Sequence, residues 1–194
     1  MPAPERTTTE QVVAAARALV EAGGTDALTM QAVAARVGVR APSLYKRVSS
    51  REHLLGLVVD GAVRELAAVL DDAAAREPDP RRRIVTLADA LRQHAHAHPR
   101  LFGLLFAPPS AGTPPPRATP TRDALEAASD AVVRTCAELV GPDHALDAAR
   151  TVTAWAYGFL TMELSGAFQL GGDPAGAFLY GAEAVARAVA TLGR

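Results

Sequence analysis

The sequence predicts an all-α protein of about nine helices, and two observations support that fold class. Apolar residues recur at helical spacing along most of the chain, and no segment shows the alternation of a β-strand. Hydrophobic residues make up 49% of the chain but aromatic residues only 5%, so alanine, leucine and valine dominate the expected core. Such a core suits close-packed helices, and a chain of 194 residues can bury one of real size.

The first two helices are expected between residue 9 and Gly38. Thr7-Thr8-Thr9-Glu10 predicts a capping box ahead of an apolar stripe, and Gly23-Gly24 ends that helix. Thr29 is the expected N-cap of a second helix. Gly38 stops this helix after about two turns, so it is short.

The next two helices differ strongly in length. The third is expected to begin near Pro42, a residue favoured at the first helical position, and to run to about Val48. Ser49-Ser50-Arg51-Glu52 then offers a cap for a long amphipathic helix that ends before Glu77-Pro78.

Three later helices are expected to open with a capping residue followed by proline, at Asp79-Pro80, Thr119-Pro120 and Asp173-Pro174. Another is expected to start at Asp143 and to continue as an apolar helix over residues 144–170. Between Pro108 and Pro120, the segment PPSAGTPPPRATP is too rich in proline for regular structure and predicts a mobile or extended loop.

Positive charge gathers in one short stretch of this nearly neutral chain. Residues 36–51 hold five basic residues and no acidic one: Arg36, Arg40, Lys46, Arg47 and Arg51. The rest of the chain carries 15 basic against 21 acidic residues, and the formal net charge is −1. Any attraction to nucleic acid must therefore be local rather than a property of the whole molecule.

The same stretch has the features of a helix-turn-helix. Two short helices are joined by a turn that contains Gly38, a residue tolerant of positive φ. Ala34 is small where the second helix must approach the first, and the second helix projects polar and basic groups. The alternative is three ordinary surface helices over residues 28–55 with a solvated charged face.

Residues 9–56 resemble the N-terminal domain of TetR-family transcriptional regulators. The stretch TMQAVAARVGVRAPSLYKRVSSREHLL follows that family's pattern at ten positions: Thr29, Val33, Ala34, Gly38, Val39, Leu44, Tyr45, Ser50, Glu52 and Leu54. It departs from the pattern at Arg40, Arg47, Val48 and Arg51. The first two departures add charge near the expected DNA face, and Val48 replaces an aromatic residue of the small core.

The resemblance implies a DNA-binding head over residues 1–55 and a ligand-binding and dimerisation domain over residues 56–194. It implies a homodimer bound to a palindromic operator in double-stranded DNA, with residues 40–47 in the major groove and Tyr45 and Arg51 on phosphates. Tyr45 could equally belong to the core. Arg40, Lys46 and Arg47 are the best candidates for base contacts. The whole expected DNA-binding set is Thr29, Arg40, Ala41, Pro42, Ser43, Tyr45, Lys46, Arg47 and Arg51.

The C-terminal half predicts a dimer interface. Between residues 151 and 170 the only charge is Glu163, and a helix that is apolar all round must be covered all round. Together with a last helix over residues 174–192, it could form a four-helix interface between two subunits, the usual device of the family. TAWAYGFLTMELSGAF also resembles the W-x-H-G segment of one TetR subclass, although Tyr157 stands where histidine is usual.

A binding site for an apolar small-molecule effector is expected in the same half. Small-molecule sites are lined mostly by apolar side chains with few polar groups, and this half contains such side chains. The candidate pocket residues are His94, His98, Phe102, Phe106, Trp155, Phe159, Met162 and Glu163. Each of them could instead be plain core or surface. The i, i+4 histidine pair could bind metal, but no carboxylate or cysteine accompanies it in the sequence, so neither a metal nor another cofactor is expected.

The remaining signals describe the class of protein. Cys136 is the lone cysteine, which excludes an intrachain disulfide, and a buried thiol is favoured over a redox sensor. No signal peptide and no run of 18 apolar residues is present, so we expect a cytoplasmic protein with no membrane partner. We expect a repressor and not an enzyme. The alternatives are an all-α carrier or enzyme with a His94/His98/Glu163 site, and an interaction protein that docks another partner.

Overall fold

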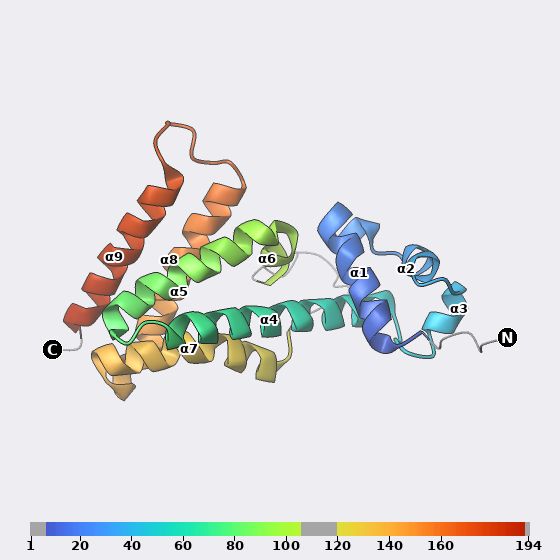
Figure 1. The fold of residues 1–194 in the computed structure, drawn as a ribbon, viewed down its shortest axis with the longest axis horizontal. Helices are drawn as coiled ribbons and strands as arrows, with labels where there is room; N and C mark the ends of the chain where they lie inside the picture. The colour runs from blue at the N-terminus through green and yellow to red at the C-terminus, as the bar shows by residue number, and fades with distance from the viewer. Residues whose placement is uncertain (1–6, 106–119, 193–194) are drawn as a thin grey trace, which may run out of the picture. The chain divides into compact units, whose positions relative to one another are not determined.

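The computed structural model describes residues 7–105 and 120–192, and this part of the chain is entirely helical (Figure 1). It contains nine α-helices, two 3₁₀ helices and no strand, which confirms the expected fold class. The α-helices are α1 (Thr9–Gly23), α2 (Met30–Arg36), α3 (Ala41–Leu44), α4 (Arg51–Ala75), α5 (Pro80–Ala97), α6 (Pro99–Leu105), α7 (Arg122–Val140), α8 (Ala145–Leu164) and α9 (Pro174–Leu192).

Within the described residues the helices form two compact units. The head unit comprises residues 7–62, 100–105 and 120–121, and the body unit comprises residues 63–99 and 122–192. Helix α4 is continuous and contributes to both. These two units are defined by the packing of the helices. The boundary after residue 55, between a DNA-binding head and a ligand-binding domain, stays a prediction. None of the described helices is long and apolar enough to span a bilayer.

The head unit has a core of small and branched side chains. Its buried members are Val12, Ala15, Ala16 and Val20 of α1, Leu28, Met30, Val33 and Ala34 at α2, Leu44 of α3, Val48 before α4, Leu54, Val58 and Ala62 of α4, and Leu101 of α6. Val48 is almost fully buried, so the valine takes a core position although the family pattern has an aromatic residue there.

Two N-caps of the head agree with the sequence, and a third is shifted by one residue. The capping box of α1 is real, but its members are Thr8 and Gln11 rather than Thr7 and Glu10. The hydroxyl of Thr29 accepts a hydrogen bond from the amide of Ala32 at 3.1 Å, as expected for the N-cap of α2. The hydroxyl of Ser50 likewise accepts from the amide of His53 at 3.0 Å and caps α4.

Helix α3 is shorter than the sequence suggested. It ends at Leu44 instead of Val48, and residues 45–47 form a turn. The amides of Arg47 and Val48 both donate to the carbonyl of Leu44, at 2.8 and 3.0 Å. The chain bends there because Val48 must enter the core before α4 begins at Arg51.

The body unit packs α5, α7, α8 and α9 around a second core. Its buried members are Ile84 of α5, Cys136 and Val140 of α7, Ala148, Ala149 and Val152 of α8, and Ala186 and Val189 of α9. Alanine at the centre of α8 lets neighbouring helices approach closely. The Asp–Pro starts at Asp79 and Asp173 are confirmed, because both carboxylates accept backbone N–H bonds.

Two expected boundaries in the body were wrong. Helix α7 begins at Arg122, two residues after Pro120; Thr119 and most of the proline-rich segment lie outside the described residues. Helix α8 ends at Leu164, so Phe168 belongs to the connection to α9 and not to the helix. Gly166, at φ 71°, ends α8: its amide donates to Glu163 and the next amide donates to Met162, which is a Schellman motif.

Candidate DNA-binding surface and effector domain

The turn between α2 and α3 is closed by the glycine that the sequence pointed to. Gly38 has φ 73°, where a side chain would be strained. Its amide donates to Ala35 at 3.3 Å and the amide of Val39 donates to Ala34 at 2.9 Å, again a Schellman motif. Ala34 is buried at this crossing, so α2 and the chain after it meet over a small side chain, as a helix-turn-helix requires.

The segment that follows presents its polar side chains outward. Leu44 and Val48 face the core, and this orientation leaves Arg40, Pro42, Ser43, Tyr45, Lys46 and Arg47 exposed and Ala41 half-buried. The side chain of Tyr45 is 55% exposed, which decides between its two readings against a core role. The residues expected to enter a groove therefore lie together on one short segment.

Four cations on this surface have no partner within the described parts of the chain. Arg36, Arg40, Lys46 and Arg47 form no ion pair or side-chain hydrogen bond with any described residue. An unpaired exposed cation keeps its full hydration and is free to bind a phosphate or a base edge. The arrangement is suited to polyanion binding.

Arg51 is positioned differently from these four. Its Nε donates to the carbonyl of Leu28 at 2.6 Å, and an Nη donates to the carbonyl of Thr25 at 2.5 Å. The guanidinium thus joins the start of α4 to the segment before α2. This shape-holding contact was not foreseen, since nothing in the sequence places a side chain beside carbonyls 23 and 26 residues earlier.

The expected pocket residues do not form one group. Phe102 is buried in the head unit, Phe106 lies outside the described residues, and Met162 is 48% exposed on α8. Trp155 and Phe159 do come together, in an aromatic cluster with Phe178 of α9 and Phe168. Trp155 stacks on Phe178 with ring centroids 5.0 Å apart, and Phe159 meets Phe168 at 4.8 Å and Phe178 at 5.2 Å.

Glu163 borders this aromatic cluster and is held by a cation. Its carboxylate accepts two hydrogen bonds from Arg92 of α5, at 2.6 and 3.1 Å, and lies 3.2 Å from Nε2 of His96. Hydrogen bonding from Arg92 lowers the pKa of Glu163, with a smaller contribution from His96, while burial opposes the shift. Arg92 also lies 6.0 Å from the ring centroid of Phe178.

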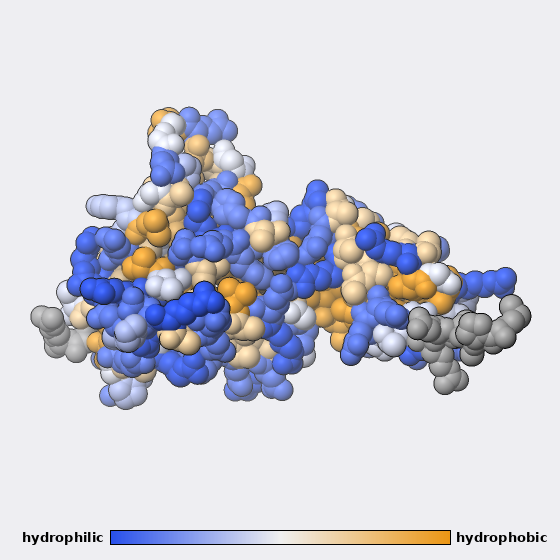
Figure 2. Space-filling model, in the orientation of Figure 1, coloured by the Kyte–Doolittle hydropathy of each residue, from blue (hydrophilic) through white to orange (hydrophobic). Residues whose placement is uncertain are grey.

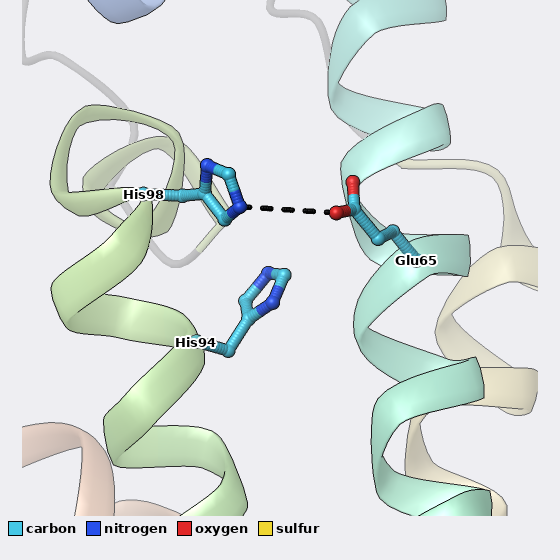
Figure 3. A group of neighbouring side chains, drawn as sticks. All are labelled: Glu65, His94 and His98. Atoms are coloured by element: carbon cyan, nitrogen blue, oxygen red, sulfur yellow. Dashed lines mark ion pairs between the residues drawn. The ribbon is translucent and has the colours of Figure 1, made fainter.

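The histidine pair has a carboxylate after all, and it is not Glu163. Nε2 of His98 lies 3.8 Å from a carboxylate oxygen of Glu65, which α4 contributes (Figure 3). The rings of His94 and His98 are 5.0 Å apart, and His94 is only 9% exposed. The statement that no carboxylate accompanies the pair was wrong, because Glu65 comes from 29 residues earlier in the chain. A joint His94/His98/Glu163 site is not formed.

Cys136 is confirmed as a buried thiol. It lies in the body core, and burial raises its pKa to about 11. Open grooves on the described surface include two that do not coincide with the expected pocket. One of about 630 Å³ runs along α5 and α9, past Arg82, Val85 and Glu183, and one of about 390 Å³ lies by Asp71, Arg83 and Arg134.

The sequence matches known families over both parts. Residues 5–58 match the bacterial regulatory proteins of the tetR family, and residues 84–185 match the tetracyclin repressor-like C-terminal domain. The chain belongs to the TetR family. TetR-family proteins are DNA-binding transcriptional regulators that act as dimers and are not enzymes, so the expected class is confirmed.

Individual relatives agree with this family membership. The chain is 30% identical to the uncharacterized HTH-type transcriptional regulator Rv0681 of Mycobacterium tuberculosis over 164 residues, 84% of this chain and 73% of that protein. A protein of unknown function from Rhodococcus sp. RHA1 has the same fold, with a TM-score of 0.78, 24% identity and 96% and 97% of the two chains covered. BioQ, solved with its natural double-stranded DNA operator, has a TM-score of 0.68 at 23% identity, over 96% and 99% of the chains.

Proposed function

We propose that this TetR-family regulator is a cytoplasmic repressor that binds a palindromic operator as a homodimer and is released by a small apolar ligand. The observation that carries the proposal is the exposed, unpaired cationic surface of Arg40, Lys46 and Arg47 beside a helix-turn-helix turn. The family's usual mode of action supports repression. The structure of BioQ with its operator supports binding to a duplex.

The DNA contacts divide into readout and positioning. Arg40, Lys46 and Arg47 contact base edges, because Arg or Lys to guanine is the commonest specific pair. The exposed hydroxyl of Tyr45 contacts a phosphate, and Thr29, Ala41, Pro42 and Ser43 border the backbone. Arg51 retains the expected phosphate role only through its remaining N–H groups, since two of its donors already bind Leu28 and Thr25.

The dimer forms through α8 and α9. Leu146, Ala154, Gly158 and Met162 lie at multiples of four along α8 and are exposed, with the ion-paired Arg150 between Leu146 and Ala154. Leu179 and Tyr180 are exposed on α9. Figure 2 shows hydrophobic residues along this helical hairpin. Small residues in the middle of such a stripe allow a second copy to approach closely, and large ones at its ends supply apolar area.

The ligand binds against the aromatic cluster of Trp155, Phe159 and Phe178. Apolar walls beside the Arg92–Glu163 ion pair fit a small, mostly apolar molecule with a polar group. The ligand acts by binding the DNA-free form more tightly than the DNA-bound form. The coupling is reciprocal, so operator DNA weakens ligand binding by the same factor.

The deciding experiment first selects bound duplexes from a random pool, which yields the half-site and the spacing. The selected duplex is then titrated with Lys46→Ala, Arg47→Ala and the double variant. Each lost base contact costs about 1–3 kcal/mol, or roughly 5- to 150-fold in affinity. Arg122→Ala is the matched control, since it removes a cation that is exposed on the body.

We expect the control to bind like the original protein. Unchanged affinity and an unchanged dependence on salt concentration in the double variant would reject the assigned DNA surface.

The dimer interface has its own test. Gly158→Glu places a charge on the α8 stripe at a position where a side chain meets nothing within 4 Å, so the protomer itself is not disturbed. Light scattering after size exclusion is expected to give the monomer mass. Gly61→Glu is the control, because Gly61 is also an exposed helical glycine with open space around it. A dimer mass in both variants would place the interface elsewhere.

A further inference from the structure

Glu65, His94 and His98 form a compact group of three potential metal ligands. One ligand atom from each lies within 4.8 Å of the other two, and within the described residues no other group of three His, Cys, Asp or Glu side chains does so. Figure 3 shows the two imidazoles of α5 and its C-cap facing the carboxylate on α4. All three residues belong to the body unit, so their geometry is internal to one unit.

The spacing is close to what a metal ion needs. Zinc–nitrogen and zinc–oxygen bonds of about 2.0–2.2 Å place neighbouring ligand atoms on a tetrahedral ion about 3.3–3.6 Å apart. The separation of 3.8 Å between His98 Nε2 and the Glu65 oxygen is already near that range. Rotation of the side chains that shifts the ligand atoms by about 1 Å brings them to these separations. His98 and Glu65 can move in this way because they are only half-buried.

The backbone favours a cation at the same place. His98 is the C-cap of α5, and its amide donates to the carbonyl of His94 at 3.0 Å. The last carbonyls of a helix carry partial negative charge, which attracts cations. An i, i+4 relation places both imidazoles on one face of the last turn. Helix α4 and the C-terminal end of α5 therefore supply the three ligand atoms.

We propose that Glu65, His94 and His98 bind a divalent transition-metal ion of the zinc class. Two imidazole nitrogens and one carboxylate oxygen suit Zn²⁺ or Co²⁺ better than Mg²⁺ or Ca²⁺, which prefer all-oxygen sites. Three protein ligands leave one tetrahedral position for water. The ion ties α4 to the end of α5 and stabilises the body unit. This site shares no residue with the proposed DNA surface or with the aromatic cluster.

The experiment titrates the full-length protein with Zn²⁺ and measures the heat of binding and the imidazole NMR signals. Five histidines give five sets of signals, and we expect only those of His94 and His98 to shift, at one ion per chain. Glu65→Gln and His98→Gln keep size and polarity but remove a ligand, and each is expected to weaken zinc binding at least about tenfold. His94→Gln is avoided, because that side chain is buried.

His96→Gln is the matched control. It is the same substitution on the same helix, but His96 lies against Glu163 instead of Glu65. We expect it to bind zinc like the original protein. The proposal is overturned if zinc binding does not saturate, if Glu65→Gln or His98→Gln binds as tightly as the original, or if His96→Gln loses the ion. In those cases the three side chains are a hydrogen-bonded cluster between two helices. DNA affinity is not part of the readout, so this result is independent of the proposed DNA-binding function.

Discussion

The head and the body use arginine in opposite ways. In the helix-turn-helix, Arg36, Arg40 and Arg47 are exposed and form no ion pair with any described residue. In the body, Arg83 pairs with Glu138 at 2.7 Å and Arg92 pairs with Glu163 at 2.6 Å. Arg134 bridges α7 to Asp71 of α4 at 3.0 Å. These three arginines of the helix-turn-helix are therefore exposed and unpaired within the described chain, whereas in the body arginine forms ion pairs that join helices.

This difference explains how a chain with a net charge of −1 can bind a polyanion. The acidic excess lies outside residues 36–51, and in the body carboxylates such as Glu138 and Glu163 are occupied by body arginines. Arg36, Arg40, Lys46 and Arg47 keep their charge available because no carboxylate of the described chain reaches them. Local pairing, rather than net charge, decides where nucleic acid can bind.

Arg51 differs from the exposed cations of the helix-turn-helix, and replacing it gives the largest expected effect on stability. Arg51→Ala removes two hydrogen bonds from a charged donor to the carbonyls of Leu28 and Thr25, so we expect a loss of about 2–3 kcal/mol in the free energy of unfolding. Arg47→Ala is expected to stay within about 0.5 kcal/mol. Urea unfolding followed by circular dichroism measures both. Equal stability of the two variants would mean that the hydrogen bonds of Arg51 to Leu28 and Thr25 do not stabilise the fold.

Helix packing in the body gives the second effect. A β-carbon on Gly181 of α9 would lie 2.5 Å from Cζ2 of Trp155, so Gly181→Ala forces α8 and α9 apart or turns the indole. We expect a loss of about 1–3 kcal/mol in the free energy of unfolding. Gly61→Ala, in open space on α4, should instead gain about 0.5–1 kcal/mol from helix propensity. A stabilised Gly181→Ala variant would contradict the close approach.

Local signals predicted the fold well because helix ends are local events. Thr29, Gly38 and Asp173 were assigned correctly from residue type and position alone, since a cap needs only its own neighbours. The sequence does not predict the end of α8, although Gly166 marks it, because the apolar run continues past this glycine to Phe168. Helix α6 was not anticipated as a separate element.

The site was harder to predict, because its contacts join distant parts of the chain. Glu65 meets His98 across 33 residues, Arg92 meets Glu163 across 71, and Arg51 meets Thr25 across 26. No spacing rule connects such pairs. The DNA-facing residues were predictable only because they lie within one short segment whose inward positions, Leu44 and Val48, fix which side chains point out.

The Arg92–Glu163 pair gives a smaller, pH-dependent effect. The pKa of Glu163 is lower in the folded protein than in the unfolded chain, so its contribution to stability is present above about pH 4.5 and is lost as pH falls through the folded pKa. Glu163→Gln should cost about 1–2 kcal/mol in the free energy of unfolding at pH 7. Below pH 4 the difference from the original protein should shrink. Parallel stability curves from pH 7 to pH 3 would contradict this linkage.

The reactivity of Cys136 contrasts the two regions most directly. Its pKa of about 11 leaves only about one thiol in a thousand ionised at pH 8, and its side chain is fully buried. We expect a thiol reagent to react with it only as fast as the body unit opens. The double variant Arg47→Cys/Cys136→Ala moves the single thiol to the exposed head and should be labelled within the mixing time. The original protein and the double variant each contain one cysteine. The ratio of their labelling rates therefore measures how strongly the body core protects a thiol compared with the exposed position in the head. Similar labelling rates would show that the body core opens readily. The ion pairs that join its helices would then not prevent this opening.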